Sequence, residues 1–532
     1  MGWENVSIEY LSSYLKQHGH QCSLAYEQNL FDDKNYVCMP FLAKLFSDPE
    51  SVLEQIIKSN PQLIAFSVMT VQYEWALNLA HLVKKHCINI PIIFGGYHPL
   101  TAPDAVIKES VVDMICVGEG EHAMLALADA IEHNKSIRNI PGIWHKDTHG
   151  VIIKNGFAKP VSDLDSLPIT DKDIFSKHAP MKTYLLSTLA RGCIYNCDYC
   201  SVSQLNAIAR QAGIKAFRIQ RVDKVIFELK YFLKKYKYKW IDFRHAIFAF
   251  DHQWILDFCK KYKEEINRPF RIFMHPSLIR DDIVSALVDA KCFTIQMGVE
   301  SFNEELRKNV LNRHESNQQI LKAIHIMEKN KIHYTMDYIL GLPEQTLQEL
   351  EDVAKLFAGL KYCYRLSPFM CQYLPGSKMI NYAVHKGEMS LADVEIINNG
   401  GHDNYMGEGS IAIFDKKKQQ ALRMYRALFR MMGLMPSWMR KLLIKSNIYK
   451  IILILPPFVP NIMIKSLDLL IIIQNRDARS YFFNYLWWVS RRFIPSHPTF
   501  LFRKRKLEII TNQSIEKTES TETTIEKAGI LQ

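Results

Sequence analysis

The sequence predicts an α/β protein in which a doubly wound parallel sheet is followed by a full or partial (β/α) barrel and a mostly helical C-terminal extension. Short apolar runs of strand length alternate with helix-length amphipathic segments in two successive stretches of the chain. The length of 532 residues exceeds what one hydrophobic core usually serves. A basic block near the C-terminus has helical patterning and no strand alternation.

The first domain is expected over residues 1–135. A helical segment, "SIEYLSSYLKQHGH", precedes three strand-like runs, "PQLIAFSVMT", "IPIIFGG" and "VDMICVG". Such a sheet normally opens with a strand before its first helix, so we expect the N-terminus to be shortened. Parallel sheets bind ligands at the carboxyl ends of their strands. The polar or glycine-bearing positions at those ends are Ser67, Thr70, Gly95, Gly96, His98, Gly118 and Glu119.

A linker with hairpin-like pieces and prolines is expected over 136–182, and a second βα series over 183–400. Its strand-like runs are "TYLLSTLA", "KWIDFRHAIF", "FRIFMHP", "CFTIQMGVES" and "HYTMDYILGLP". Each is separated from the next by a segment of helix length. The series predicts a barrel whose chemistry lies at the C-terminal ends of the strands.

The net charge of +11 resides in one block of the chain. Residues 416–506 hold 19 basic and 2 acidic residues, a net of +17, whereas 1–415 and 507–532 each carry a net of −3. We expect a basic helical region over 401–510 and a disordered tail over 511–532. No secretory signal is visible and the remaining cysteines show no disulfide spacing, so we expect a cytoplasmic protein.

Three cysteines are crowded into "RGCIYNCDYC", directly after a predicted strand. A structural zinc site needs four protein ligands, usually in paired motifs. The spacing of Cys193, Cys197 and Cys200 instead favours a [4Fe–4S] cluster with one iron left open, since thiolates are the usual ligands of such clusters. Incidental thiols, or a zinc loop that borrows a distant histidine, are the alternatives.

With this motif, the chain resembles the radical S-adenosylmethionine (SAM) enzymes. The resemblance implies that the three cysteines bind the cluster and that SAM chelates its open iron and is cleaved to a 5′-deoxyadenosyl radical. "MGVES" resembles the segment that contacts the SAM ribose, and "YILGLPEQT" the segment beside the adenine. The SAM contacts implied are Tyr199, Gly298, Glu300, Ser301, Arg313 and Gly341.

Several of these positions have ordinary structural alternatives. Glu300 could cap the helix near "FNEELRK", "GLPEQT" could be a simple turn, and Arg313 could be a surface arginine. In "DFRHAIF", the stretch with His245 replaces acidic residues that relatives often carry after the second strand. His245 is therefore either an altered contact or a partly buried histidine without a role in catalysis.

The first domain resembles the cobalamin-binding, flavodoxin-like domain that precedes the radical module in one large subgroup. The resemblance runs through "FSVMTVQY", "FGGYHPLTAPDAVI" and "VDMICVGEGEHAMLAL" and makes the seven strand-end residues named above cobalamin contacts. No Asp-x-His-x-x-Gly motif occurs, so we expect no histidine as lower ligand of cobalt and take His98 as a polar or structural residue. A flavodoxin-like domain without a cofactor is the alternative.

The basic segment 416–506 has three interpretations. Trp- and Phe-rich apolar patches beside Arg and Lys favour peripheral contact with an anionic membrane. No nucleic-acid-binding motif accompanies the charge, so no nucleic acid is expected. A helical cap on the barrel with a solvated basic face is the alternative, and the apolar run at 451–464 is too short to span a bilayer.

Together these features predict a cobalamin-dependent radical SAM enzyme that methylates an unactivated carbon of a small or lipid-like substrate. Its cofactors would be a [4Fe–4S] cluster, SAM and cobalamin, with a flavodoxin or ferredoxin as reductant. An oxidative cyclase or rearrangement enzyme without methyl transfer is the alternative within the class. A non-catalytic corrinoid- or metal-binding carrier or sensor is the alternative outside it.

Overall fold

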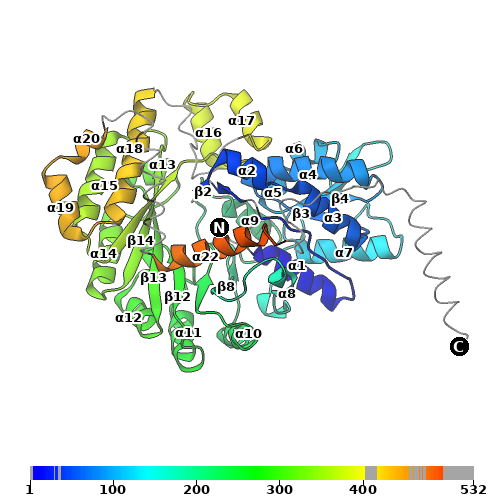
Figure 1. Ribbon diagram of the computed structural model, residues 1–532, viewed down its shortest axis with the longest axis horizontal. Coiled ribbons are helices and arrows are strands. Elements are labelled where there is room, and N and C mark those ends of the chain that lie inside the picture. Colours follow the sequence, from blue (N-terminus) through cyan, green and yellow to red (C-terminus); the bar gives the residue numbers. More distant parts are fainter. Residues whose placement is uncertain are drawn as a thin grey trace, which may run out of the picture.

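A computed structural model describes residues 4–28, 30–33, 37–401, 416–453 and 475–494, together with the single residues 459, 467 and 470. An N-terminal α/β domain and a larger strand-and-helix domain lie side by side (Figure 1). Basic helices follow at the C-terminal end of the described chain. The predicted tail at 511–532 lies outside the described residues.

The first domain holds a five-stranded sheet in the order β3-β4-β5-β6-β7. The first three strands are parallel and the last two antiparallel. β6 and β7 come from the segment predicted as a linker, because the hairpin-like apolar pieces there pair onto the edge of β5. The bounds are β3 Ile64–Ser67, β4 Ile92–Gly95, β5 Met114–Cys116, β6 Ile143–Lys146 and β7 Ile152–Ile153.

Helices cover this sheet on both faces, as a doubly wound fold requires. α1 packs against α7, and α3 packs against α4. Among the described residues α1 is the first regular element, capped by the side chain of Asn5, and a small hairpin of β1 and β2 follows it. The bounds are α1 Val6–Gln17, β1 Asp32–Asp33, β2 Val37–Cys38, α2 Pro40–Phe46, α3 Pro49–Ser59, α4 Tyr73–His86, α5 Tyr97–Thr101, α6 Pro103–Lys108 and α7 Gly120–Glu132.

The second domain is an open barrel of six parallel strands in the order β8-β11-β12-β13-β14-β15. This confirms the predicted α/β architecture and makes the barrel partial. A separate two-stranded ribbon of β9 and β10 flanks the loop that carries the cysteines. The bounds are β8 Tyr184–Ser187, β9 Ala190–Arg191, β10 Arg218–Ile219, β11 Trp240–Phe243, β12 Phe270–Met274, β13 Cys292–Glu300, β14 His333–Leu340 and β15 Cys363–Met370.

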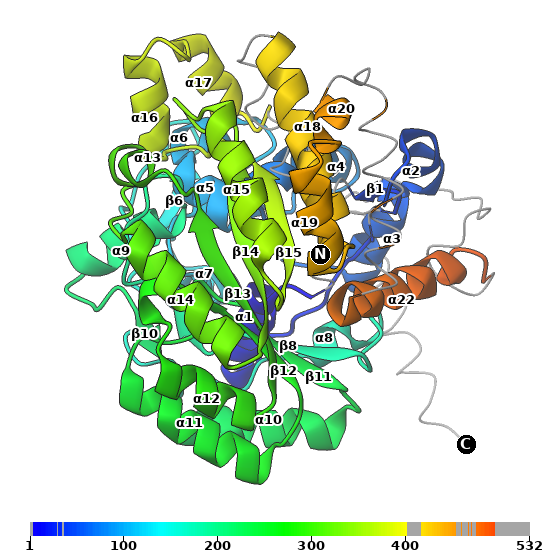
Figure 2. The same cartoon turned by 90° about the vertical axis from the view of Figure 1, so that its left-hand side faces the viewer.

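Helices connect these strands and pack on the convex face of the sheet (Figure 2). Alternate strand residues such as Ile295, Met297 and Val299 are fully buried against them in the largest core of the molecule. The bounds are α8 Asp173–Ser176, α9 Val202–Gln211, α10 Val222–Lys235, α11 His252–Glu265, α12 Asp281–Asp289, α13 Glu304–Asn309, α14 Asn317–Lys329, α15 Leu347–Gly359, α16 Lys378–His385 and α17 Leu391–Asn398.

The concave face of the barrel is polar and keeps partial exposure. On β13 and β14 the residues that alternate with the buried ones are Gln296, Gly298, Glu300 and Asp337, and all four are half-buried. The Gln296 side-chain amide donates to Asp337 at 2.7 Å. A polar, accessible inner face is what a substrate site needs, whereas the outer face serves packing.

The basic C-terminal region is helical, as predicted, and packs on the barrel. α18 Lys416–Gly433 lies against β15, and α19 Ser437–Lys445 lies against α15. α20 Tyr449–Leu453 follows and contacts α18. Among the described residues, no helix is both long and apolar enough to cross a bilayer.

α22, Arg476–Arg491, lies across the strand starts on the inner side of the sheet (Figures 1 and 2). Trp240 and Thr183 bond to its residues Ser480 and Asn484, at 3.2 and 2.8 Å. The Tyr481 hydroxyl donates to Asp242 at 3.0 Å.

The Asp242 carboxylate also accepts from Arg271 at 2.7 and 2.9 Å. Burial would raise the pKa of Asp242, but Arg244 and Arg271 lower it to about 2. The C-terminal helix is thus tied to the interior of the barrel through a buried ionic network.

Candidate active site

The cysteine loop follows β9 and is held by Asn206 of α9. The Asn206 side-chain oxygen accepts from the Cys193 backbone N–H at 3.1 Å, and its amide donates to the Cys193 and Tyr195 carbonyls at 2.8 and 3.0 Å. Gly192 precedes the loop with φ +75°, and a Cβ there would lie 2.0 Å from the Ala216 carbonyl oxygen. The loop conformation is therefore set by backbone hydrogen bonds and one obligatory glycine.

The three predicted ligands are half-buried free thiols on this loop. Three thiols on one short loop offer three ligands to a four-iron cluster and leave its fourth corner open. The residues present therefore accommodate the [4Fe–4S] group.

Arg313 links the cysteine loop to β13. Its guanidinium donates to the Gly298 carbonyl at 2.8 Å and to the Tyr199 hydroxyl at 3.3 Å, and it lies 3.7 Å from the Glu300 carboxylate. The arginine is 6% exposed. Four of the predicted SAM residues therefore meet in one cluster around Arg313, which is a buried residue and not a surface arginine.

Glu300 lies at the end of β13 with φ +65°, an unusual value for a residue with a side chain. Burial raises the pKa of Glu300 to about 7, and the charge of Arg313 opposes that rise. A Cβ on Gly298 would lie 2.6 Å from the Glu300 carboxylate oxygen, so glycine keeps this side chain in place. The Glu300 carboxyl can form hydrogen bonds, as the predicted contact with the SAM ribose hydroxyl requires.

Ser301 and Gly341 lie on either side of this cluster. The Ser301 hydroxyl accepts from the Asn303 backbone N–H at 3.1 Å, and its carbonyl accepts from Arg307. Gly341 has φ +80°, and its N–H donates to Gln345 at 2.8 Å. The structure shows local turn roles for both residues, and their SAM contacts stay predictions.

His275 and Glu315 belong to the same site, although sequence reasoning missed them. His275 follows β12, and its ring stacks on Tyr195 of the cysteine loop with centroids 3.9 Å apart. Its Nε2 lies 3.4 Å from Glu315, which accepts from the Arg313 Nε at 2.7 Å. The histidine at the end of the predicted strand "FRIFMHP" was the sequence signal that could have pointed to His275.

His275 and Glu315 complete a ring of contacts that starts and ends on the cysteine loop. Burial would raise the pKa of Glu315, but the His275 hydrogen bond and the Arg313 charge lower it to about 2. The ionised Glu315 thus holds the guanidinium of Arg313 in place through its contact with Nε.

The predicted cobalamin residues lie at the strand ends of the first sheet, as expected. Ser67 accepts from the Asn5 side chain at 3.2 Å, and Thr70 lies 3.3 Å from His98 Nδ1. The His98 ring is fully buried and packs on the Tyr73 ring with centroids 4.1 Å apart and the planes tilted by 38°. Burial lowers the pKa of His98 to about 4.

Two observations at this edge fit a large polar ligand. The Tyr73 hydroxyl is buried without a hydrogen-bond partner in the described part of the chain. Gly96 has φ +97°, and a Cβ there would lie 2.9 Å from the Val68 backbone, so the turn requires glycine at this position. The residues present therefore accommodate a cobalamin at the strand ends.

Glu119 joins the two domains. Its carboxylate pairs with Arg191 at 2.9 Å and with Arg218 at 2.5 Å, and it accepts from the Val161 N–H at 3.0 Å. The adjacent Gly118 has φ +124° and packs on Ala158. These glycine and carboxylate positions have packing and ion-pair roles in the structure, and their cobalamin contacts stay predictions.

The turn "GGYH" of the first domain also approaches the cysteine loop. Tyr97 and Leu205 pack against the apolar core that contains Ile208, and Leu205 and Ile208 belong to α9, the helix that follows the cysteine loop. The turn after β4 therefore lies against the segment that follows the cysteines. Sequence reasoning missed Tyr97 although it lies between two predicted contacts, Gly96 and His98.

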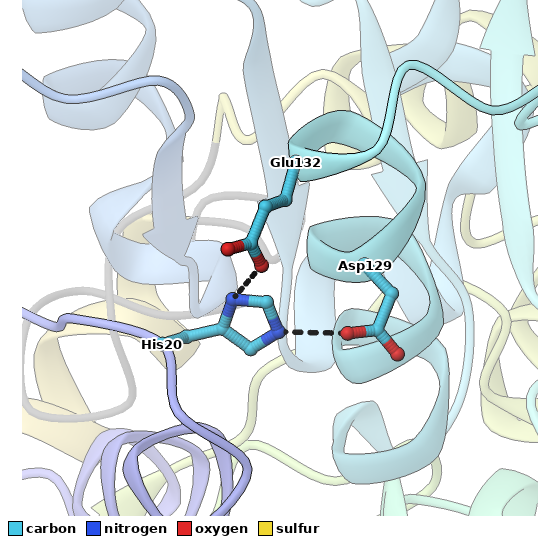
Figure 3. A group of neighbouring side chains, drawn as sticks. All are labelled: His20, Asp129 and Glu132. Atoms are coloured by element: carbon cyan, nitrogen blue, oxygen red, sulfur yellow. Dashed lines mark hydrogen bonds and ion pairs between the residues drawn. The ribbon is translucent and has the colours of Figure 1, made fainter.

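Two further histidines have structural explanations. His245 Nε2 lies 3.0 Å from the Phe248 carbonyl, and burial lowers its pKa to about 4, which supports the reading as a partly buried histidine. His20 lies between Asp129 and Glu132, at 3.0 and 3.4 Å (Figure 3). Each ring nitrogen of His20 faces a different carboxylate, so the group links the segment that follows α1 to α7.

Comparison with known protein families agrees with this division of the chain. The family described as B12 binding domain matches residues 2–128, and the Radical SAM superfamily matches residues 187–357.

Curated relatives match about two thirds of the chain. An uncharacterized methyltransferase, PH0819 of Pyrococcus horikoshii, is 25% identical over 349 residues, which are 64% of this chain and 72% of that protein. The anaerobic magnesium-protoporphyrin IX monomethyl ester cyclase of Rubrivivax gelatinosus is 22% identical over 66% of this chain. The chain spans 62% of that cyclase.

Solved structures share the fold. The cobalamin-dependent SAM radical enzyme OxsB, solved with aqua-cobalamin and SAM, gives a TM-score of 0.62 at 16% identity over 99% of this chain and 79% of OxsB. The radical SAM methyltransferase TsrM from Kitasatospora setae, solved with cobalamin and a [4Fe-4S] cluster, gives 0.57 at 12% identity over 71% and 72%. The chain therefore belongs to the radical SAM enzymes that carry an N-terminal cobalamin-binding domain.

Proposed function

We propose that this enzyme transfers a methyl group to an unactivated carbon of a small or lipid-like substrate. The observation that carries the proposal is the shared interface of the two modules. Glu119 of the cobalamin-binding domain pairs with Arg191, two residues before the first predicted cluster cysteine. Radical formation and methyl supply would then serve one substrate position. The methyltransferases among the relatives support this reaction.

The chain's own residues would bind and orient the reactants. Cys193, Cys197 and Cys200 would hold the cluster, and Arg313, Tyr199 and Glu300 would position SAM beside it. When bound, the cofactors supply a 5′-deoxyadenosyl radical and a transferable methyl group. The half-buried inner face around Gln296 and Asp337 would take the substrate, and the surrounding strands would exclude water from the radical.

The test is turnover of anaerobically reconstituted, full-length protein with SAM carrying a deuterated methyl group and a low-potential reductant. A flavodoxin or ferredoxin is the reductant that we propose in the cell. Transfer predicts S-adenosylhomocysteine and 5′-deoxyadenosine in parallel, together with a labelled product in a cell extract. A protein that carries both cofactors and makes neither nucleoside would be a carrier or sensor.

A second candidate is radical cyclisation or rearrangement without methyl transfer. The similarity to the magnesium-protoporphyrin ester cyclase of Rubrivivax gelatinosus favours it. The same assay separates the two, because a cyclase yields 5′-deoxyadenosine without S-adenosylhomocysteine. The label would then be absent from the product.

A further inference from the structure

α19 and α20 expose large apolar side chains beside lysines. The exposed fractions are 67% for Trp438, 37% for Met439, 60% for Leu442, 55% for Ile448 and 57% for Ile451. Lys441, Lys445 and Lys450 are exposed among them. We call these eight residues the Trp438 face; large exposed apolar patches with a polar rim mark protein or membrane contacts.

The opposite side of α19 is firmly packed, so the Trp438 face is not the result of a loose helix. Arg440 is 4% exposed, stacks on Phe357 at 4.4 Å, and donates to the Cys363 carbonyl at 3.0 Å. The Ser437 hydroxyl bonds to the Ala358 carbonyl at 3.1 Å. These contacts fix which residues of the helix point outward.

The charge around the Trp438 face is positive. Residues 416–453 contain no Asp or Glu. Glu351 of the neighbouring α15 pairs with Lys355 at 3.2 Å, and its pKa is lowered first by Tyr449, then by Lys355 and last by the charge of Lys450. Because the lysines have no acidic partner within their own segment, the face is complementary to an anionic surface.

We propose that the Trp438 face docks on an anionic lipid bilayer. Trp and Leu beside Lys on a short helix are suited to the headgroup region, where the rings and aliphatic chains enter and the ammonium groups meet phosphate. An acidic protein surface offers the charge but no apolar layer for five large side chains. Docking goes beyond the proposed reaction and does not depend on methyl transfer.

The test is flotation of the full-length, anaerobically reconstituted protein with two kinds of vesicle. One is phosphatidylcholine alone, and the other contains about 30% phosphatidylglycerol, which makes its surface moderately anionic. The variant W438S/K441E removes one apolar and one basic group from the face. Its matched control is F227S/K234E on α10, where Phe227 is 60% exposed.

Docking predicts that the wild type and the α10 control float with the anionic vesicles and that W438S/K441E loses at least tenfold in vesicle affinity. Near-equal binding to neutral vesicles would contradict the role of the lysines. Equal loss in both variants, or no flotation of the wild type, would overturn the proposal. Circular dichroism and iron content check that each variant remains folded and loaded.

Discussion

The Glu119 carboxylate of the cobalamin-binding domain lies 2.9 Å from the guanidinium of Arg191, two residues before the first cluster cysteine. Arg191 also pairs with Glu121 at 2.5 Å. Burial would raise the pKa of Glu119, but the charge of Arg191 is the largest of the effects that lower it. The ion pair fixes the edge of one cofactor domain to the loop that holds the other cofactor.

We expect Glu119→Gln to destabilise the protein by about 3 kcal/mol, because it removes the carboxylate that pairs with the buried Arg218. Chemical denaturation of the apoprotein measures the change. Lys154→Gln is the control, since its pair with Asp104 is largely exposed and should cost less than about 1 kcal/mol. Equal losses for the two variants would show that Glu119 is not a central interdomain contact.

We expect Cys193→Ala, Cys197→Ala and Cys200→Ala each to abolish the iron–sulfur absorption and to lower bound iron severely, because each removes one of three thiolate ligands. Iron analysis after anaerobic reconstitution measures this. Cys22→Ala is the control, as this cysteine lies in the first domain. Zinc retained in stoichiometric amount by the wild type would contradict the cluster assignment.

We expect Arg313→Lys to weaken SAM binding by at least tenfold while the cluster stays in place. A lysine keeps the charge but cannot make the separate contacts to Gly298, Tyr199 and Glu315. The measurements are SAM titration and the change in the cluster's electron paramagnetic resonance spectrum on SAM addition. Arg221→Lys is the control, because this side chain is 83% exposed. An unchanged SAM affinity in Arg313→Lys would show that Arg313 does not bind SAM.

We expect the buried Asp242 network to make stability fall at acid pH. The folded pKa of about 2 lies below the usual 3.8, so ionised Asp242 contributes stability above pH 3.8 that is lost as the pH falls through about 2. Asp242→Asn should cost about 3 kcal/mol at neutral pH and flatten this part of the pH profile. Urea denaturation from pH 2 to 7 tests it, and an unchanged profile would contradict the assignment.

We expect cobalamin to bind without a histidine ligand to cobalt. His98 is fully buried against Tyr73, and its low pKa reflects a neutral ring packed inside the domain. The electron paramagnetic resonance spectrum of the bound Co(II) form should lack nitrogen splitting from a protein ligand. Splitting that disappears in His98→Gln would contradict this reading.

The parts of the fold and the site that could be predicted are those that show a pattern within a short stretch of sequence. Alternating apolar runs predicted the parallel strands of both sheets. One short spacing is the basis for Cys193, Cys197 and Cys200 as cluster ligands, and this assignment stays a prediction. The linker was harder to define, because β6 and β7 join the sheet through pairing with the edge of β5, which is not visible in their own sequence.

The roles of His275 and Glu315 could not be assigned from the sequence, because they depend on Arg313 and on a ring stack between distant segments. Glu119 was assigned to a ligand from its glycine-rich turn. Its partners Arg191 and Arg218 lie 72 and 99 positions away, beyond any local signal.

The bond between Tyr481 and Asp242 joins groups 239 positions apart in the chain. During synthesis the strand that bears the carboxylate leaves the ribosome long before its phenolic partner exists. The inner wall is therefore complete only after α22 has been synthesised, and a premature stop upstream of α22 would yield a barrel with an unfinished interior. Contacts of such long range also slow folding, so assistance by chaperones fits a chain assembled in this order.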